Sequence, residues 1–297
     1  MTENLAVFTQ NLTKSYGRVR ALKGVDLEVR RGEIFGFLGP NGAGKTTAIR
    51  CFLDLIRPDG GKVEVLGFDP QKNPVDVRAR TGYLPGELHF DQNLRVEGVF
   101  RYFNQLRGGK ANWGFVRELS GRLDLDLKTS IKNLSKGNKQ KVGVIQALMH
   151  RPEMLLLDEP TSGLDPLIQK QVLRLLRDAR DEGSTVFFSS HVLSEVQEIA
   201  DKVGIIRKGK VIEVADTISL IQKSLHRARV HFKQPVDPAD FRNIPGIQVL
   251  SHENGMLLFQ VEGDMDGFIK ALASYPVRDF DTERPSLEEI FLAYYEE

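Results

Sequence analysis

One eight-residue segment constrains this 297-residue chain more than any other. Residues 39–46 read GPNGAGKT, which matches the phosphate-binding pattern G-x-x-x-x-G-K-[ST]. The segment follows a short apolar run, Glu33–Leu38, and precedes a helix-like stretch, Lys45–Leu55. A strand, a glycine-rich loop and a helix in this order predict an α/β fold whose loop binds phosphate at a helix N-terminus.

The residue types in this loop suit the chemistry of phosphate binding. Glycines let backbone N–H groups approach phosphate oxygens closely. Lys45 supplies a cation for the β- and γ-phosphates, and the Thr46 hydroxyl can ligate Mg²⁺. The predicted phosphate-binding residues are Gly39, Asn41, Gly42, Ala43, Gly44, Lys45, Thr46 and Thr47.

A second apolar run, Met154–Leu157, ends in the acidic pair Asp158 and Glu159. Such runs alternate with helix-like stretches and predict buried parallel strands, as does Thr185–Phe188. Ligands bind at the C-terminal ends of such strands, so Asp158 is predicted to hold Mg²⁺ and Glu159 to polarise an attacking water. An ordinary acidic turn is the alternative, and the phosphate-binding loop upstream disfavours it.

A third segment narrows the class. Leu134-Ser135-Lys136-Gly137-Asn138 precedes a helical stretch and places Ser135 23 residues ahead of Asp158. Here the chain resembles the ATP-binding cassette (ABC) family, whose signature is typically LSGGQ. The resemblance implies that Ser135, Lys136, Gly137 and Asn138 contact the ATP held by a second subunit. Lys136 and Asn138 depart from the usual Gly and Gln.

Other positions follow the family's order. The resemblance implies that Tyr16 stacks on adenine, that Asp165 lies in the D-loop, and that His191 contacts the γ-phosphate and helps to orient the water. One position departs, because Gly86 and Glu87 stand where the family has its Q-loop glutamine. Gly86 has no side chain to reach Mg²⁺, and whether Glu87 replaces the glutamine stays open.

The charge balance and the sequence pattern change near Thr217, because the Gly-rich loops between strand-like runs give way to short alternating segments. Residues 217–297 carry 8 Lys and Arg against 13 Asp and Glu, whereas the first 216 residues carry 33 against 27. We predict an ABC ATP-binding domain at 1–216 and a small α+β domain at 217–297. The resemblance implies a mixed sheet, an antiparallel β subdomain and a helical insertion at about 88–147 for the first domain. For the second, Ile218–Leu225 is predicted as a connecting helix, residues 247–261 as a hairpin and Pro285–Tyr295 as a final helix.

Composition limits the partners. A net charge of +1 disfavours a general polyanion binder, so no nucleic-acid partner is expected. The single cysteine, Cys51, cannot form an internal disulfide, which fits a reducing cytosol. No apolar stretch reaches the roughly 18–20 residues that span a bilayer, and the first residues do not look like a signal peptide. Work at a membrane would therefore require a partner.

The resemblance implies a subunit that binds ATP with Mg²⁺, forms a homodimer around two ATP molecules and hydrolyses them. It would drive separate integral membrane permease subunits from the cytoplasmic face of the membrane, with an exporter favoured. The signature form, residues 83–87 and the segment 285–291 resemble the bacterial ABC-2-type exporters, including drug and antibiotic resistance systems. One alternative is a soluble ABC ATPase acting on ribosomes or DNA. The short spacing between Lys45 and Ser135 and the single cassette disfavour it. The other alternative is an importer subunit.

Overall fold

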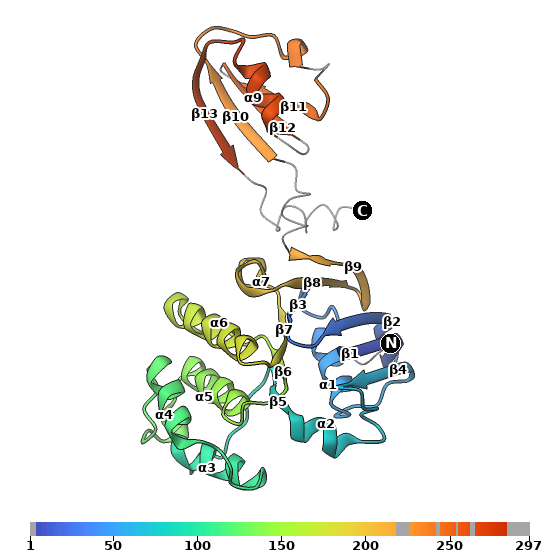
Figure 1. Cartoon of the computed structure of the whole chain (residues 1–297), viewed down its shortest axis with the longest axis vertical. Coiled ribbons are helices and arrows are strands. Elements are labelled where there is room, and N and C mark those ends of the chain that lie inside the picture. The colour runs from blue at the N-terminus through green and yellow to red at the C-terminus, as the bar shows by residue number, and fades with distance from the viewer. Residues whose placement is uncertain (1–3, 218–225, 242–243, 254, 262–264, 284–297) are drawn as a thin grey trace. The chain divides into compact units, whose positions relative to one another are not determined.

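The protein is described by a computed structural model that covers residues 4–217, 226–241, 244–253, 255–261 and 265–283 (Figure 1). It divides into two compact units, Met1–Ala215 and Asp216–Glu297. The two helices expected at Ile218–Leu225 and Pro285–Tyr295 lie outside the described residues.

The first unit is built on a six-stranded sheet in the order β5-β6-β7-β3-β8-β9. From β5 to β8, neighbouring strands run parallel. The strands predicted from apolar runs are confirmed, and every residue of β3, β6 and β7 is buried, as expected for strands covered on both faces. The strand bounds are β3 Ile34–Leu38, β5 Thr81–Leu84, β6 Met154–Asp158, β7 Thr185–Ser190, β8 Lys202–Arg207 and β9 Lys210–Asp216.

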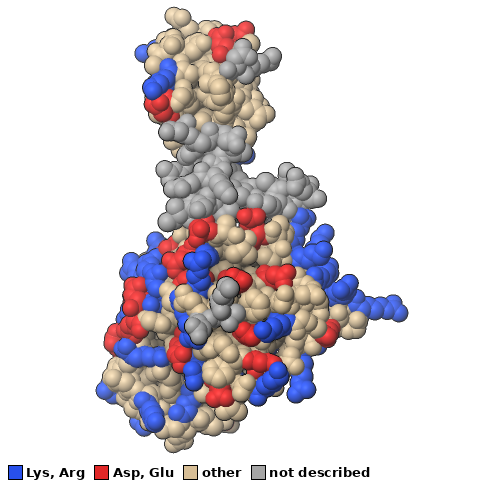
Figure 2. All heavy atoms as spheres, turned by 45° about the vertical axis from the view of Figure 1, so that its right-hand side comes forward, with Lys and Arg blue, Asp and Glu red and all other residues tan. Residues whose placement is uncertain are grey.

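A second, antiparallel sheet has the order β2-β1-β4. Its strands are β1 Leu5–Tyr16, β2 Val19–Arg30 and β4 Gly60–Val65. With the mixed central sheet it gives the P-loop ATPase architecture, so the predicted fold class is confirmed. Acidic and basic side chains alternate over most of the visible face of this unit, and Lys and Arg gather along one edge (Figure 2). The small net charge thus reflects mixed signs, not a lack of charged groups.

Seven α-helices accompany the sheets in the described part of the first unit. They are α1 Lys45–Phe52, α2 Pro74–Arg80, α3 Val96–Leu106, α4 Trp113–Arg122, α5 Lys136–Leu148, α6 Pro166–Asp181 and α7 Leu193–Ile199, and a short 3-10 helix spans Ile131–Asn133. Side-chain caps begin three of them, because Asn112, Ser135 and Asp165 accept hydrogen bonds from the N–H groups of α4, α5 and α6. In the chain, α3 to α5 fall between β5 and β6 and form the helical region at the lower left of Figure 1.

Helix α1 ends at Phe52, three residues before the predicted end at Leu55. The backbone of Asp54 has a φ of 50°, in the left-handed region that a continuing helix cannot contain. The apolar residues after Phe52 therefore belong to a turn.

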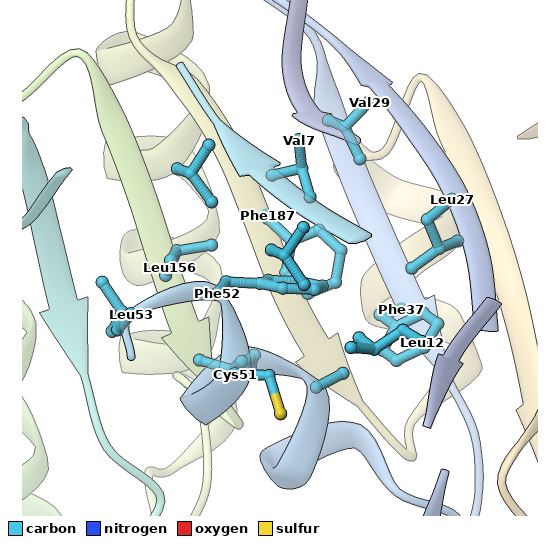
Figure 3. Packing of buried hydrophobic residues seen from close by; sticks show 14 of the residues in the cluster. Val7, Leu12, Leu27, Val29, Phe37, Cys51, Phe52, Leu53, Leu156 and Phe187 are labelled. Carbon is cyan, nitrogen blue, oxygen red and sulfur yellow. The ribbon is translucent and has the colours of Figure 1, made fainter. Parts of the chain in front are cut away.

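An aromatic cluster lies at the centre of the first unit's core (Figure 3). Phe187 of β7 stacks on Phe35 at 5.6 Å between ring centroids, and it contacts Phe37 at 5.4 Å and Phe52 at 5.5 Å. All four rings are fully buried. The cluster joins two strands of the central sheet to α1, the helix that follows the phosphate-binding loop.

Substituting Phe187→Ala is expected to destabilise this unit by about 3–5 kcal/mol, because it leaves a cavity among three rings that cannot collapse fully. Trp113, the single tryptophan of the chain, lies in the same unit, so its fluorescence during urea unfolding reports the change. Leu167→Ala is the control, since Leu167 is 77% exposed and should change the free energy of unfolding by less than about 0.5 kcal/mol. Equal losses in both variants would contradict the prediction.

The second unit contains a four-stranded sheet in the order β11-β12-β10-β13. Its elements are β10 His226–Phe232, the 3-10 helix Pro238–Phe241, β11 Ile247–Glu253, β12 Met256–Val261, α9 Asp266–Leu272 and β13 Val277–Glu283. The hairpin predicted over residues 247–261 is confirmed, because β11 and β12 pair antiparallel. The unit has its own core, with Phe241, Phe259 and Phe268 in edge-on contact.

Candidate nucleotide-binding and catalytic site

The glycine-rich loop connects the buried end of β3 to the first turn of α1. Gly44, just before the helix, has a φ of 113°, which side-chain-bearing residues rarely adopt. A Cβ atom at this position would lie 2.7 Å from the Ala21 carbonyl oxygen. Only glycine therefore allows the loop to turn here while β2 packs against it.

Lys45 points its ammonium group back into this loop. Its Nζ donates to the carbonyl oxygens of Gly39 (2.5 Å) and Pro40 (3.2 Å) and lies 3.4 Å from Glu159 Oε1. The residue is only 6% exposed, and burial lowers the pKa of its amine, while the charge of Glu159 opposes that shift. The loop thus holds a buried cation whose partners, carbonyl and carboxylate oxygens, resemble phosphate oxygens.

Thr46 and Asp158 meet across the end of the sheet. The Thr46 hydroxyl donates to Asp158 Oδ2 at 2.6 Å, and the Ser189 hydroxyl donates to Asp158 Oδ1 at 2.5 Å. A hydroxyl from the first turn of α1 and a carboxylate from the end of β6 are oxygen donors of the kind that Mg²⁺ prefers beside a nucleotide. The donor set present therefore fits the predicted metal.

Glu159 follows Asp158 in a left-handed conformation, with a φ of 50°. Its carboxylate lies between two side chains, because Oε2 is 2.8 Å from His191 Nδ1 and Oε1 faces Lys45. Its backbone is also held, since Ser189 accepts from its N–H and Gln140 Nε2 donates to its carbonyl at 3.0 Å. The structure thus brings the three predicted residues Lys45, Glu159 and His191 together.

Lys45, Asp158 and Glu159 line a cleft of about 690 Å³ in the first unit, whereas His191 is not among the residues that line it. Its lining includes Tyr16, Val19, Arg20, Ala21, Lys23, Pro40, Asn41, Gly42, Gly44, Lys45, Thr46, Thr47, Arg50, Gly86, Glu87, Lys136, Asp158, Glu159, Ser162 and Lys208. Tyr16 is 46% exposed and lines this cleft, and the Lys14 ammonium lies over its ring, 5.9 Å from the centroid. An apolar rim, a cationic loop and an acidic end occur in one cleft that could accommodate a nucleotide.

The departure at residue 86 has a steric explanation. A Cβ atom on Gly86 would lie 2.9 Å from Asp158 Oδ2, so any side chain there would press on the predicted metal ligand. Glu87, the next residue, also lines the cleft. The backbone of this segment therefore approaches Asp158 closely, and Gly86 cannot supply the side chain of the missing glutamine.

The signature residues are divided in space. Of the residues that the structure describes, the cleft's lining includes Lys136 but not Ser135, Gly137 or Asn138. Ser135 instead caps α5, accepting from the Asn138 N–H at 3.1 Å. Asp165 caps α6 and is also absent from that lining. Within one chain, Lys136 therefore lines the cleft together with the glycine-rich loop, whereas the other three signature residues and Asp165 do not.

Two residues that hold the site were not singled out from the sequence. Ser189 contacts both Asp158 and Glu159, and Gln140 contacts the carbonyls of Glu159 and Pro160. Ser189 lies at the C-terminal end of an apolar strand, the same signal that identified Asp158. Gln140 is a buried polar residue on α5, and its partners depend on how that helix packs.

The fold and this arrangement of residues define a P-loop nucleoside triphosphatase. The ABC transporter family matches residues 22–162, and the C-terminal domain of DrrA1-3-like ATP-binding proteins matches residues 217–295. The chain is 40% identical to the bacitracin transport ATP-binding protein BcrA of Bacillus licheniformis over 69% of this chain and 68% of BcrA. It is 32% identical to the daunorubicin/doxorubicin resistance ATP-binding protein DrrA of Streptomyces peucetius over 97% of this chain and 92% of DrrA.

Solved structures of ABC transporter ATP-binding proteins have the same fold as this chain. The ATP-binding subunit of an ABC transporter superposes with a TM-score of 0.66 and 26% identity, covering 72% of this chain and 91% of that protein. The dimeric bacterial ABC transporter cassette MJ0796 has the same fold, with a TM-score of 0.64 and 23% identity over 71% of this chain and 98% of the cassette. The chain belongs to the ATP-binding proteins of the ABC transporter family and is an ATPase of that family, so the resemblance drawn from the motifs is confirmed. Among the helices that the structure describes, none combines the length and apolar character needed to cross a bilayer.

Proposed function

We propose that this protein is the ATP-hydrolysing subunit of a drug- or antibiotic-exporting ABC transporter. Two copies close around two ATP molecules and drive separate permease subunits, to which the protein attaches at the cytoplasmic face of the membrane. The observation that carries the proposal is the Thr46–Asp158 hydrogen bond of 2.6 Å, with Lys45 and Glu159 beside it, because it joins the phosphate-binding and metal-binding motifs in one cleft. The names of BcrA and DrrA support the transport of a drug or antibiotic.

In this proposal each side chain has one task. Lys45 and the loop amides bind the phosphates, and Tyr16 stacks on the base. Thr46 and Asp158 would hold Mg²⁺, which would neutralise charge on the phosphates. Glu87, which lines the same cleft, takes the part of the missing glutamine. Glu159 accepts the proton of the attacking water, and His191 orients Glu159 through the 2.8 Å contact between them.

The second copy completes the site. Since Ser135, Gly137 and Asn138 do not line the cleft of their own chain, the proposal assigns them to the ATP of the other chain. The helix N-terminus that Ser135 caps offers N–H groups to an anion. Lys136 follows Ser135 and also lines the cleft of its own chain, so its positive charge lies between the two proposed ATP sites. Asp165, at the start of α6, is assigned to the same contact between subunits.

Dimerisation tests this assembly directly. With saturating ATP and Mg²⁺, the hydrolysis-deficient Glu159→Gln variant should shift from monomer to dimer in multi-angle light scattering. Adding Ser135→Arg should abolish the shift, because the longer charged side chain occupies the place of the phosphate. Lys132→Arg is the control, since Lys132 is exposed and lies before the signature, and it should leave the dimer intact.

A strictly monomeric profile under these conditions, with and without the permease, would count against the proposed dimer. The transporter assignment has its own test: when co-expressed with a permease of an ABC exporter encoded in the same genome, this protein should co-purify with it, and the complex should hydrolyse ATP faster than this protein alone. Association with ribosomes or DNA in its place would favour the alternative of a soluble ABC ATPase.

A further inference from the structure

Glu195 is a buried carboxylate that none of the motifs includes. It lies in the first turn of α7 and is 6% exposed. Oε1 accepts a hydrogen bond from the Thr161 hydroxyl at 2.5 Å, and Oε2 accepts one from the Ser190 hydroxyl at 2.7 Å. Thr161 and Ser190 are themselves 3% and 2% exposed. In the part of the chain that the structure describes, neither oxygen of Glu195 forms an ion pair.

A carboxylate buried without a cation costs free energy unless hydrogen bonds compensate, and the Thr161 and Ser190 hydroxyls supply one hydrogen bond to each of its oxygens. The two hydroxyls are set as donors to it. Ser190 Oγ accepts from the Val192 N–H at 2.9 Å, which leaves its proton for Glu195, and the competing Val192 carbonyl is farther away at 3.2 Å. Glu195 is thus a two-oxygen acceptor between two segments of backbone.

Those two segments carry the proposed catalytic pair. β6 and β7 are paired as far as Asp158 and Ser189, and the Glu159 N–H still donates to the Ser189 carbonyl at 3.2 Å. Beyond this point β6 and β7 no longer pair with each other, although Ser190 stays in the sheet through its pairing with Leu38 of β3. Thr161 lies two residues after Glu159, and Ser190 lies immediately before His191. Glu195 therefore bridges the loop after β6 to the last residue of β7.

We propose that Glu195 is a positioning residue for ATP hydrolysis, which fixes the loop after β6 against the end of β7, where His191 follows. Through this bridge it keeps the Glu159 carboxylate and the His191 imidazole at their 2.8 Å contact. The inference rests on the proposed roles of Glu159 and His191. It adds that their alignment depends on a residue that touches neither nucleotide nor metal.

The test compares kcat with ATP affinity in the full-length protein. Glu195→Ala should lower kcat about tenfold or more while the Kd for ATP, measured with a fluorescent analogue, stays within about twofold. Glu195→Gln should keep most of the wild-type activity, because its amide can still bond both hydroxyls. The amide oxygen accepts from Thr161, and the amide N–H can donate to Ser190 Oγ once the Ser190 proton turns to the Val192 carbonyl. Glu198→Ala is the matched control on the same helix, where the side chain is exposed, and it should match wild type.

A double-mutant cycle separates positioning from general damage. In a His191→Ala background, Glu195→Ala should cause little further loss of kcat, since the pair it aligns is already broken. If the double variant instead lost kcat by the product of the two single-variant losses, the proposal would be overturned. A wild-type kcat for Glu195→Ala, or an equal loss of kcat in Glu195→Gln and Glu195→Ala, would also overturn it. Should Glu195→Ala fail to bind ATP, Thr161→Val takes its place, because it removes one donor and keeps the shape; an unchanged kcat there also overturns the proposal.

The proposed function fails in a different way. If His191→Ala and Glu159→Gln each hydrolyse ATP at the wild-type rate, the catalytic assignment itself is wrong, whatever Glu195 does. If they are impaired and the Glu195 and Thr161 variants are not, only the bridge is refuted.

Discussion

Glu159→Gln is expected to lower steady-state ATP hydrolysis by about 100-fold or more while leaving ATP affinity within about twofold of wild type. The amide keeps the size of the carboxylate, so the contacts with His191 and Lys45 can persist in altered form. It cannot accept a proton from water, however, and the proposed general base is lost. The measurement is phosphate release at saturating ATP, together with a nucleotide titration of the same preparation.

Glu182→Gln is the matched control for this substitution. Glu182 lies at the end of α6 in the same unit and forms an exposed ion pair with Arg151 at 2.5 Å. Exposed pairs of this kind contribute little, so the control should hydrolyse ATP normally. If Glu159→Gln also turned over at the wild-type rate, the proton acceptor would have to be another group.

How far such a site can be predicted from sequence depends on the range of the interactions. The strands β3, β6 and β7 could be predicted because both faces of each are buried, which requires continuous apolar runs. Asp158, the last residue of β6, could be predicted from its place at the end of an apolar run, whereas His191 after β7 was predicted from the family resemblance. Local signals of this kind cover the core of the sheet and most of the cleft.

The long strands of the antiparallel sheet give a weaker signal. β1 and β2 alternate only in part, because the register of their pairing shifts at several places, including between Thr9 and Leu12. A shift of one residue reverses which side chains face the core, so no clean period of two survives. The family resemblance, not periodicity, predicted this sheet.

Contacts between distant segments could not be read from the sequence. Asp158 and Ser189 face each other because β6 and β7 pair in one register, and 31 residues separate them. The bridge from Glu195 to Thr161 spans 34 residues and depends on how α7 packs against the same strands. Serine and threonine hydroxyls are common and short, so their presence indicates nothing until the fold places an acceptor beside them.

Lys45→Ala is expected to weaken ATP binding by about 2–5 kcal/mol, which corresponds to roughly 30-fold to several thousand-fold in Kd. Lys45 Nζ is buried among the oxygens of Gly39, Pro40 and Glu159, and no other residue places an ammonium among these atoms in the part of the chain that the structure describes. Removing the Lys45 ammonium also leaves the negative charge of Glu159 without its neighbouring cation. An incoming phosphate would then be repelled by that carboxylate.

Comparing nucleotides identifies which phosphates the lysine serves. Lys45 is assigned to the β- and γ-phosphates, so Lys45→Ala should lose affinity for ATP and ADP while its weak binding of AMP stays unchanged. Isothermal titration of the three nucleotides measures this, and Lys72→Ala is the control, since the Lys72 side chain is 81% exposed and pairs with Asp69 outside the cleft. An equal loss for AMP would mean that the substitution disrupts the loop as a whole, because AMP lacks the phosphates that the lysine is proposed to bind. Wild-type affinity for ATP would show that the loop amides alone bind the phosphates and that Lys45 serves another purpose.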